Sequence, residues 1–428
     1  MSLLVFLLSF LIFILCGMPI AWAMITSTML WMLISNELVF MLIIPDRIFQ
    51  GIDLFILMAV PLFILVGELL NASKITDRLV QTANDFFGWL RGGLAQVNIA
   101  SSMLFSGITG VALGDIAALG RIFIPAMVKQ GFSAEYAAAV TSSSSIIGPM
   151  VPPSLIIIIY GATTGTSIGA LFAACLVPGL FIGISQMLLV WSQASKKGER
   201  NVQPRQAAGT LLRSGVASMI PLMVPVIILS GILAGVMTPT EAGAVAAFYA
   251  ILVGSLYYRN LDISGLNEAL QNTLGLSGKL LIVVGCGTVF SLVMAIENVP
   301  TILQGVIQQY SMGPVLTLLI ANLILLIIGM FIDPAAAIIL FAPLLSEVAK
   351  AAGVDPVHFG VIMILNLNLG LLTPPLGICL FAAEQIADCG IPALLRELLP
   401  FLLTTLAVLL LVTYIPAISL WLPALLGF

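Results

Sequence analysis

The sequence predicts an all-α protein that crosses a membrane many times, and its composition and length carry this prediction. Of its 428 residues, 61% are hydrophobic and 8% are charged, whereas roughly a quarter of the residues of a soluble domain are charged. A helix needs about 20 apolar residues to cross a bilayer, so the chain has room for on the order of ten to thirteen crossings. The strand-like alternation of a membrane β-barrel is missing.

Charged residues divide this apolar chain into two halves of nearly equal length. The first basic residue is Arg47, so residues 1–23 lack the positive start of a signal peptide and are expected to form a membrane helix. The strongest basic cluster lies in residues 192–213 and is predicted to be a cytoplasmic linker. Its basic residues are Lys196, Lys197, Arg200, Arg205 and Arg213.

Two segments have the spacing of amphipathic helices. In residues 71–91, apolar side chains recur every three or four positions and charged side chains occupy the other faces. Such a helix is expected to lie along the membrane interface. Residues 299–310 show a weaker pattern of the same kind. Ordinary solvated loops remain the alternative for both segments.

An internal repeat relates the two halves. Residues 115–125 align without gaps on residues 333–343, and the two segments share an aspartate, two alanines, a phenylalanine and a proline. Farther along the chain, a glycine and a double proline match in the same order. These matches pair Gly148 with Gly370, Pro152 with Pro374, and Pro153 with Pro375.

Each repeat contains a hydrophobic stretch that is interrupted at its midpoint. These stretches, residues 131–161 and 353–384, are 31 and 32 residues long, whereas two complete crossings would need about 40 residues. We therefore predict that each stretch is a re-entrant helical hairpin. A second interruption precedes each stretch, at residues 106–110 and 329–333, and is predicted to be a broken transmembrane helix.

The interruptions are where we expect the chemistry of the protein. Backbone groups released by a break are costly in hydrocarbon, so they must face protein, an ion or water. Carbonyls at a break can bind a small cation and half-helix N-termini can face an anion, as in transporters built from repeats. Close packing through small residues is the alternative explanation for the glycines and serines. Polar side chains near the interruptions are substrate-site candidates: Ser142, Ser144, Ser145, Asn366 and Asn368.

Two aspartates, Asp115 and Asp333, are further candidates because they stand beside the earlier pair of interruptions. An unpaired charge within a membrane segment costs about 2.5–3.5 kcal/mol. Each aspartate could therefore serve as a cation ligand, as a proton carrier or as the N-cap of the following half-helix. The sequence leaves these roles open.

Enzyme signatures are incomplete or missing. Residues 165–169 match GxSxG but follow no strand, and the sequence has neither GxxxxGK[ST] nor HExxH. The five cysteines form no CxxC, and the single histidine, His358, cannot build a typical metal site alone. We predict no enzyme, no bound cofactor and no nucleic-acid partner. An intramembrane enzyme using Ser167 or Asp115 remains an alternative, although it would lack a base.

Three motifs resemble the large membrane subunit of tripartite ATP-independent periplasmic (TRAP) transporters. They are the Gly-Pro-Met-Val-Pro-Pro-Ser of residues 148–154, the Gly-Leu-Leu-Thr-Pro-Pro-Leu-Gly of residues 370–377, and the Thr-Pro-Thr-Glu-Ala-Gly that opens residues 238–249. In the last motif, Thr238 and Glu241 also have the spacing of a capping box. The resemblance covers essentially the whole chain.

The resemblance implies a fold and an activity. The fold would have two inverted repeats, with an elevator-type transport domain that moves against a scaffold. The activity would be sodium-driven uptake of an organic acid, such as a dicarboxylate, a sugar acid or sialic acid. A periplasmic binding protein would deliver the substrate, a small four-helix membrane subunit would be a separate chain, and the complex would lie in a bacterial inner membrane. A stand-alone sodium/anion symporter that needs no binding protein is the alternative.

The resemblance also implies two sodium sites, in which several residues act through backbone carbonyls. The first site matches Ser106, Thr109, Gly148, Val151 and Pro153. The second site matches Gly329, Gly370, Thr373 and Leu376. Sodium, as the coupling ion, is the only metal expected. Before Asp115 the chain departs from the family pattern, because it reads Ser-Gly-Ile-Thr-Gly-Val-Ala-Leu-Gly.

These expectations give a predicted domain organisation. The transport domain would comprise residues 94–165, with the first broken helix and hairpin, and residues 312–390, with the second. The scaffold would comprise residues 1–93 with the first interfacial arm helix, residues 166–311 with the basic linker and the second arm helix, and residues 391–428 with a C-terminal helix.

Overall fold

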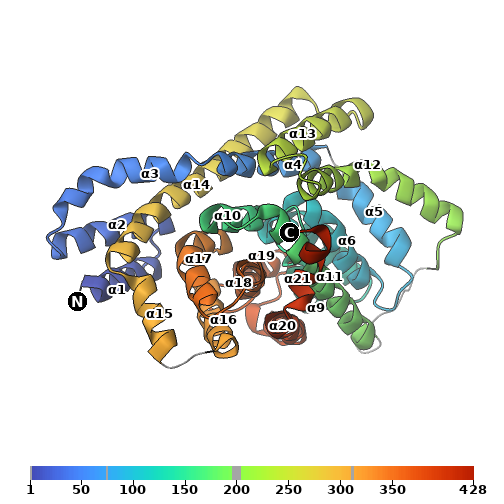
Figure 1. Ribbon diagram of the computed structural model, residues 1–428. Helices are drawn as coiled ribbons and strands as arrows, with labels where there is room; N and C mark the ends of the chain where they lie inside the picture. Colours follow the sequence, from blue (N-terminus) through green and yellow to red (C-terminus); the bar gives the residue numbers. More distant parts are fainter. Residues whose placement is uncertain (1, 74–75, 195–203, 310–312) are drawn as a thin grey trace.

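The computed structural model describes residues 2–73, 76–194, 204–309 and 313–428, and these ranges contain helices but no strand (Figure 1). Eight of the described helical segments are long and apolar enough to cross a membrane. The fold class expected from composition, an all-helical multi-pass membrane protein, is confirmed. Lys196, Lys197 and Arg200 of the predicted basic linker lie outside the described residues.

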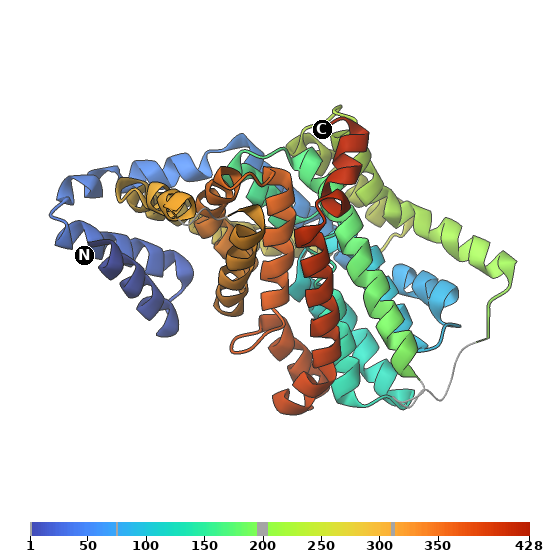
Figure 2. The same ribbon diagram turned by 60° about the horizontal axis from the view of Figure 1, so that its bottom comes forward.

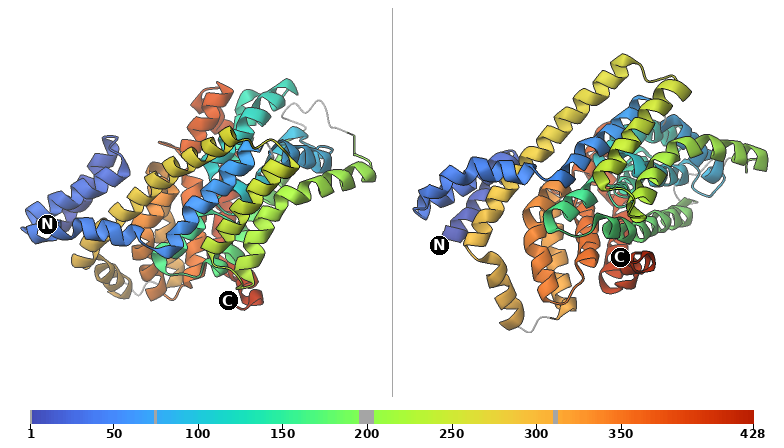
Figure 3. Two further views of the ribbon diagram at one scale, coloured as in Figure 1. Left: turned by 90° about the horizontal axis from the view of Figure 1, so that it is seen from above. Right: turned by 45° about the horizontal axis from the view of Figure 1, so that its top comes forward.

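An outer group of helices lies along one edge of the molecule. The long helix α14 packs on α2, α3 and α4, α4 packs on α13, and α12 joins α13 to α5. Figure 1 shows α3, α14, α4, α13 and α12 along the upper edge, with α2 at the left and α5 at the right, and Figure 3 shows α14, α4 and α13 side by side. The outer group consists of α1 (Ser2–Leu15), α2 (Ile20–Ile34), η1 (Leu38–Ile43), α3 (Ile44–Ile52), η2 (Phe55–Met58), α4 (Ala59–Ala72), α5 (Thr76–Phe87), α12 (Ala208–Leu233), α13 (Pro239–Leu252), η5 (Val253–Tyr257), α14 (Ile263–Ile296) and α15 (Val299–Gln309).

An inner group of helices contains both repeats and packs below the outer group (Figure 1). Here α20 packs on α9 and α11, α18 packs on α16, and α10 packs on α17. The inner group consists of α6 (Leu94–Thr109), α7 (Ala112–Asp115), the π-helical turn η3 (Ile116–Gly120), α8 (Arg121–Lys129), α9 (Ala134–Ser145), α10 (Leu155–Thr164), α11 (Ile168–Gln193), α16 (Pro314–Phe331), α17 (Pro334–Ala351), α18 (Pro356–Gly370), α19 (Ile378–Ala387), α20 (Ile391–Tyr414) and α21 (Ala417–Leu426).

Each half of the inner group has one hairpin and one interrupted helix. In the first hairpin, α7, η3 and α8 pack back against α6, and in the second hairpin α17 packs back against α16. By contrast, α9 packs on α19 and α20 whereas α10 packs on α17. Figure 2 shows α9 toward the bottom of the molecule and α10 toward its top. Likewise, α18 packs on α16 whereas α19 packs on α9.

This arrangement corrects our assignment of the interruptions. Residues 131–161 and 353–384 form interrupted helices, and the breaks at residues 106–110 and 329–333 belong to the turns of the hairpins. We had argued that each stretch is too short for two complete crossings and must therefore be a hairpin. We had not considered that it could be one crossing that is broken in the middle. Because α9 has 12 residues and α10 has 10, the two together give 22 residues, or about 33 Å of helix, which is about the thickness of the hydrocarbon.

Local sequence signals fix several helix ends. Thr238 and Glu241 form the expected capping box, in which the Thr238 hydroxyl accepts from the Glu241 N–H and the Glu241 carboxylate accepts from the Thr238 N–H at 2.8 Å. Ser133 caps α9, and Gly110 ends α6 with a φ of 60° that favours glycine. The two predicted amphipathic segments form helices α5 and α15.

A single carboxylate connects the N-terminal helices to the rest of the outer group. The Ser2 hydroxyl and the Trp31 indole N–H both donate to Glu297 Oε1, each at 2.6 Å. These hydrogen bonds, the Ser2 one first, hold the pKa of the Glu297 carboxyl below its ordinary value. The contact joins α1 and α2, which pack on each other, to the end of α14.

Candidate functional site

Each interrupted helix is broken by a non-helical linker that carries the repeated Pro-Pro. The first linker is residues 146–154 between α9 and α10, and the second is residues 371–377 between α18 and α19. The repeated glycine lies within the first linker, as Gly148, and directly before the second, as Gly370 at the end of α18. Both Pro-Pro bonds, Pro152–Pro153 and Pro374–Pro375, are cis.

The turn of the first hairpin packs against the backbone of the first linker. An ideal Cβ on Gly110 would lie 3.1 Å from the carbonyl oxygen of Pro153 and 3.1 Å from Ser154 Cα. Gly148 is equally confined, because a Cβ there would meet the Asp115 carboxylate. Residues with side chains would separate these segments, so the glycines permit direct backbone contact.

The turn of the second hairpin packs in a similar way against the end of α18, directly before the second linker. An ideal Cβ on Gly370 would lie 2.6 Å from both Cα and the carbonyl oxygen of Gly329. A Cβ on Gly329 would lie 3.1 Å from the carbonyl oxygen of Leu367. The structure thus brings Gly329 and Gly370 of the predicted second sodium site together, as it brings the Asp115 region and Gly148 together in the first half.

Several carbonyl oxygens in these two places accept no backbone hydrogen bond from a described residue. Within the first linker they belong to Gly148, Val151 and Pro153, and around the second linker to Gly329, Thr373 and Leu376. The Gly370 carbonyl accepts from the Thr373 N–H at 3.0 Å. Six of the nine predicted sodium ligands therefore offer a carbonyl that helix hydrogen bonding has not used.

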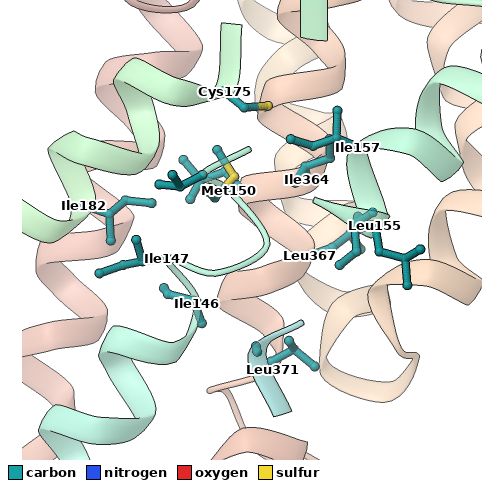
Figure 4. Packing of buried hydrophobic residues seen from close by; sticks show 14 of the residues in the cluster. Ile146, Ile147, Met150, Leu155, Ile157, Cys175, Ile182, Ile364, Leu367 and Leu371 are labelled. Carbon is teal, nitrogen blue, oxygen red and sulfur yellow. The ribbon is translucent and has the colours of Figure 1, made fainter. Parts of the chain in front are cut away.

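Apolar side chains hold the first linker in place. Figure 4 shows Ile146, Ile147 and Met150 of the linker packed with Cys175 and Ile182 of α11. Every residue from 146 to 154 is buried. Its side chains thus fix the linker in the protein interior, where a backbone carbonyl requires a polar partner.

Two predicted sodium ligands, Ser106 of the first hairpin and Thr373 of the second linker, each donate their hydroxyl hydrogen to a backbone carbonyl. The Ser106 hydroxyl donates to the Met103 carbonyl at 2.7 Å, and Thr109 is the last residue of α6. The Thr373 hydroxyl donates to the Leu369 carbonyl at 3.0 Å. In both hydroxyls the oxygen lone pairs remain available after the O–H has donated.

The two aspartates occupy different environments. Asp333 is the N-cap of α17, where its Oδ1 accepts from the Ala335 N–H at 2.9 Å, so the capping role is observed there. Asp115 ends α7, is 1% exposed and lies against Gly148. The π-helical turn η3 begins at the next residue, and such turns often accompany functional sites.

The serines predicted for the substrate site line the end of α9. Their hydroxyls donate to carbonyls of their own helix, at 3.2 Å for Ser142, 3.1 Å for Ser144 and 2.7 Å for Ser145. Ser102 of α6 donates to the Ser144 hydroxyl at 2.9 Å. The second-half helix α19 packs on α9, so elements from both halves converge here.

The predicted asparagines line the end of α18. Asn366 donates to the Asn322 side-chain oxygen at 2.7 Å, and Asn368 donates to the Ile364 carbonyl at 2.8 Å. The side-chain oxygens of Asn366 and Asn368 are buried and have no hydrogen-bond partner among the described residues. Each can therefore accept a hydrogen bond or bind a cation.

Sequence reasoning missed two buried amides that support these segments. Asn322 of α16 accepts from Asn366, and Gln186 of α11 donates to the carbonyl of Ser143, in the last turn of α9, at 3.0 Å. Gln186 also reaches Thr405 of α20 at 3.5 Å. A polar residue inside an otherwise apolar run was the available signal.

Ser167, a residue of the enzyme alternative, and the single histidine both have structural partners. The Ser167 hydroxyl accepts from the Ala170 N–H at 3.3 Å and caps α11. His358 is hydrogen-bonded to Ser419 at 2.7 Å and to the Thr413 carbonyl. Within the described ranges no three metal-ligating side chains come together.

Comparison with known proteins identifies the family. A family model, the tripartite ATP-independent periplasmic transporter, DctM component, matches residues 7–418. The chain belongs to this family. TRAP permeases are transporter subunits, so the chain is a membrane permease and not an enzyme, and the resemblance seen in the three motifs is confirmed.

Relatives agree with this membership, and a solved structure shares the fold. The chain is 40% identical over 380 residues to the sialic acid TRAP transporter large permease protein SiaM of Vibrio cholerae, with 89% of each chain covered. It is 35% identical over 381 residues to the C4-dicarboxylate TRAP transporter large permease protein DctM of Pseudomonas aeruginosa, again with 89% of each covered. The YdaH transporter of Alcanivorax borkumensis has a similar fold, with a TM-score of 0.65 at 13% identity over 91% of this chain and 90% of that one.

Proposed function

We propose that this TRAP permease is the large membrane subunit of a sodium-coupled symporter that imports an organic acid. One observation carries the proposal: in each half, a hairpin turn lies against the break of an interrupted helix, and three carbonyls at this place accept no backbone hydrogen bond from a described residue. Buried carbonyls need a partner, and a small cation satisfies several of them at once. Sodium at such helix breaks is a recurring feature of secondary transporters.

The substrate would be an acid held near the two linkers. Ser154 is the N-cap of α10, and its buried hydroxyl oxygen has no hydrogen-bond partner among the described residues. A half-helix N-terminus attracts an anion. This supports a site for a carboxylate, and the oxygen atoms of Asn366 and Asn368 can accept hydrogen bonds from hydroxyl groups of such a substrate. The relatives are named for sialic acid and C4-dicarboxylates, and we extend that class of substrate to this chain.

The moving unit would contain the two hairpins and the two interrupted helices, arranged as inverted repeats, and would slide against the outer group as an elevator. The sequence predicted residues 94–165 and 312–390 for this unit and placed α11 and α20 in the scaffold. Because α11 and α20 pack on the interrupted helices, we propose to extend the unit to include them. The outer group, with α5 and α15 as arms, would be the scaffold.

The complex would also need two partners. We propose that a periplasmic binding protein delivers the substrate and that a separate small membrane subunit completes the permease in a bacterial inner membrane. No resident cofactor is proposed, because the coupling ion is itself transported.

Reconstitution tests this function. The full chain, its small subunit and the binding protein would be placed in proteoliposomes with an inward sodium gradient and a panel of sialic acid, C4-dicarboxylates and sugar acids. We expect uptake of one acid that collapses when sodium is replaced by potassium. Uptake at the same rate in sodium and in potassium would refute sodium coupling. Full uptake without the binding protein would favour the stand-alone symporter.

A further inference from the structure

An open groove runs between α5 and the first half of α12, away from both linkers. Its volume is about 520 Å³. The groove is lined by Phe86 of α5 and by one face of α12, made of Ala208, Leu211, Leu212, Gly215, Val216 and Met219. The lining is apolar throughout, so the occupant must present hydrocarbon.

Polar contacts beside the groove hold its two walls together. Thr82 of α5 donates to the Ser214 carbonyl at 3.3 Å and contacts the Ser218 hydroxyl, and Ser214 hydrogen-bonds Asp85. The groove side remains open, because Leu212 is 71% exposed and Met219 is 62% exposed. Gly215 widens it, since an ideal Cβ there would lie 3.7 Å from the Phe86 ring.

A cation lies over an aromatic ring at one end of this groove. Arg205, three residues before the groove begins, lies over the Trp89 ring at 5.1 Å, and the Trp89 N–H donates to the Phe86 carbonyl at 2.8 Å. Stacking uses the face of the guanidinium, so the N–H groups at its edge can still donate to phosphate oxygens. The basic linker places this end on the cytoplasmic side.

We propose that this groove binds an anionic phospholipid, with one acyl chain along α12 and the phosphate at Arg205. Tryptophan and arginine at the mouth of an apolar groove match the level of lipid headgroups, and a cytoplasmic leaflet rich in anionic lipid attracts cations. A helix of a partner subunit would also cover the apolar face, but it would give Arg205 no phosphate to bind.

The groove lies near the junction between the outer group and the first hairpin. α5 packs on α6 and is joined to it by residues 88–93. The bound lipid therefore lies where the outer group continues into the first hairpin.

Lipid retention tests the proposal directly. The full chain would be incorporated into phosphatidylcholine vesicles that contain a minor fraction of phosphatidylglycerol, extracted in mild detergent, and analysed for retained phospholipid by mass spectrometry. We expect enrichment of phosphatidylglycerol, reduced about fivefold in Arg205→Gln and maintained in Arg205→Lys. Gly215→Phe, which fills the groove, should reduce retention of the same lipid.

Arg213→Gln is the matched control, because it removes an equal charge eight positions after Arg205, at a residue of α12 that does not line the groove. Its retention should equal that of the unchanged chain. Equal retention of both phospholipids, or equal loss in the Arg205→Gln and Arg213→Gln variants, would overturn the proposal. Loss of the lipid when the small membrane subunit is added would assign the groove to that subunit instead.

Discussion

The two halves of the inner group use the same backbone device with different surroundings. The first linker is buried along its whole length, whereas Pro375 and Leu376 of the second linker are exposed. Serine hydroxyls line the end of α9, whereas asparagine amides line the end of α18. The difference teaches that close backbone contact through glycine is the shared feature, and that access to solvent separates the two halves in this conformation.

We expect the largest effect from a methyl group that disrupts the close backbone contact between the turn of the second hairpin and the end of α18. Gly370→Ala would place Cβ 2.6 Å from the Gly329 Cα and oxygen, which forces the backbone apart at a cost of about 1–3 kcal/mol or more. We expect sodium-driven uptake to fall more than about tenfold. Gly275→Ala in α14, where a Cβ meets nothing within 4 Å, is the control. Equal activity of the two variants would show that uptake does not depend on the close contact between Gly370 and Gly329.

The buried amides Gln186 and Asn322 should contribute similarly to stability, although one is a donor and the other an acceptor. Gln186→Leu leaves the Ser143 carbonyl of the first half without its donor, and Asn322→Leu removes the acceptor of Asn366 in the second half. An unsatisfied buried polar group costs about 1–3 kcal/mol. Thermal unfolding in detergent should show a lower midpoint temperature for each variant than for the original chain. A variant with an unchanged midpoint would show that its amide does not stabilise the fold.

Hydroxyl substitutions should have smaller effects, because backbone carbonyls remain. Thr373→Ala and Ser106→Ala each remove an oxygen beside a proposed sodium site. We expect the sodium concentration for half-maximal uptake to rise by about two- to fivefold, since one hydrogen-bonding group contributes about 1 kcal/mol. Thr373→Ser keeps the hydroxyl and serves as the control. Unchanged sodium activation in both alanine variants would remove these hydroxyls from the sites.

Solvent access to the two linkers gives the mildest test. On a background without the five native cysteines, Leu376→Cys should react with a water-soluble thiol reagent faster than Val151→Cys, because the parent residues are 48% and 8% exposed. Labelling rates measured by mass spectrometry would compare them. Sodium or substrate that reverses the order would indicate exchange of access between the halves.

Much of this site could be predicted from the sequence because its main determinants are local. Gly148 and the double prolines lie in the two linkers, and Gly370 is the last residue of α18 before the second linker. The assignment of hairpins and broken helices failed because residue count alone does not distinguish an interrupted crossing from a short hairpin. Gln186 and Asn322 were missed because their partners, Ser143 and Asn366, are distant in the chain and only the fold brings them together.

The Glu297 contact has a consequence for the order of synthesis. Trp31 and Glu297 are separated by 266 positions, so a ribosome that adds 5–20 residues per second makes the carboxylate on the order of 10–50 s after the indole. During that interval α1 and α2 lack their contacts with α14 and can pack only on each other and on the segment η1–α3 that follows them. The first two helices must therefore insert before their main partner in the outer group exists.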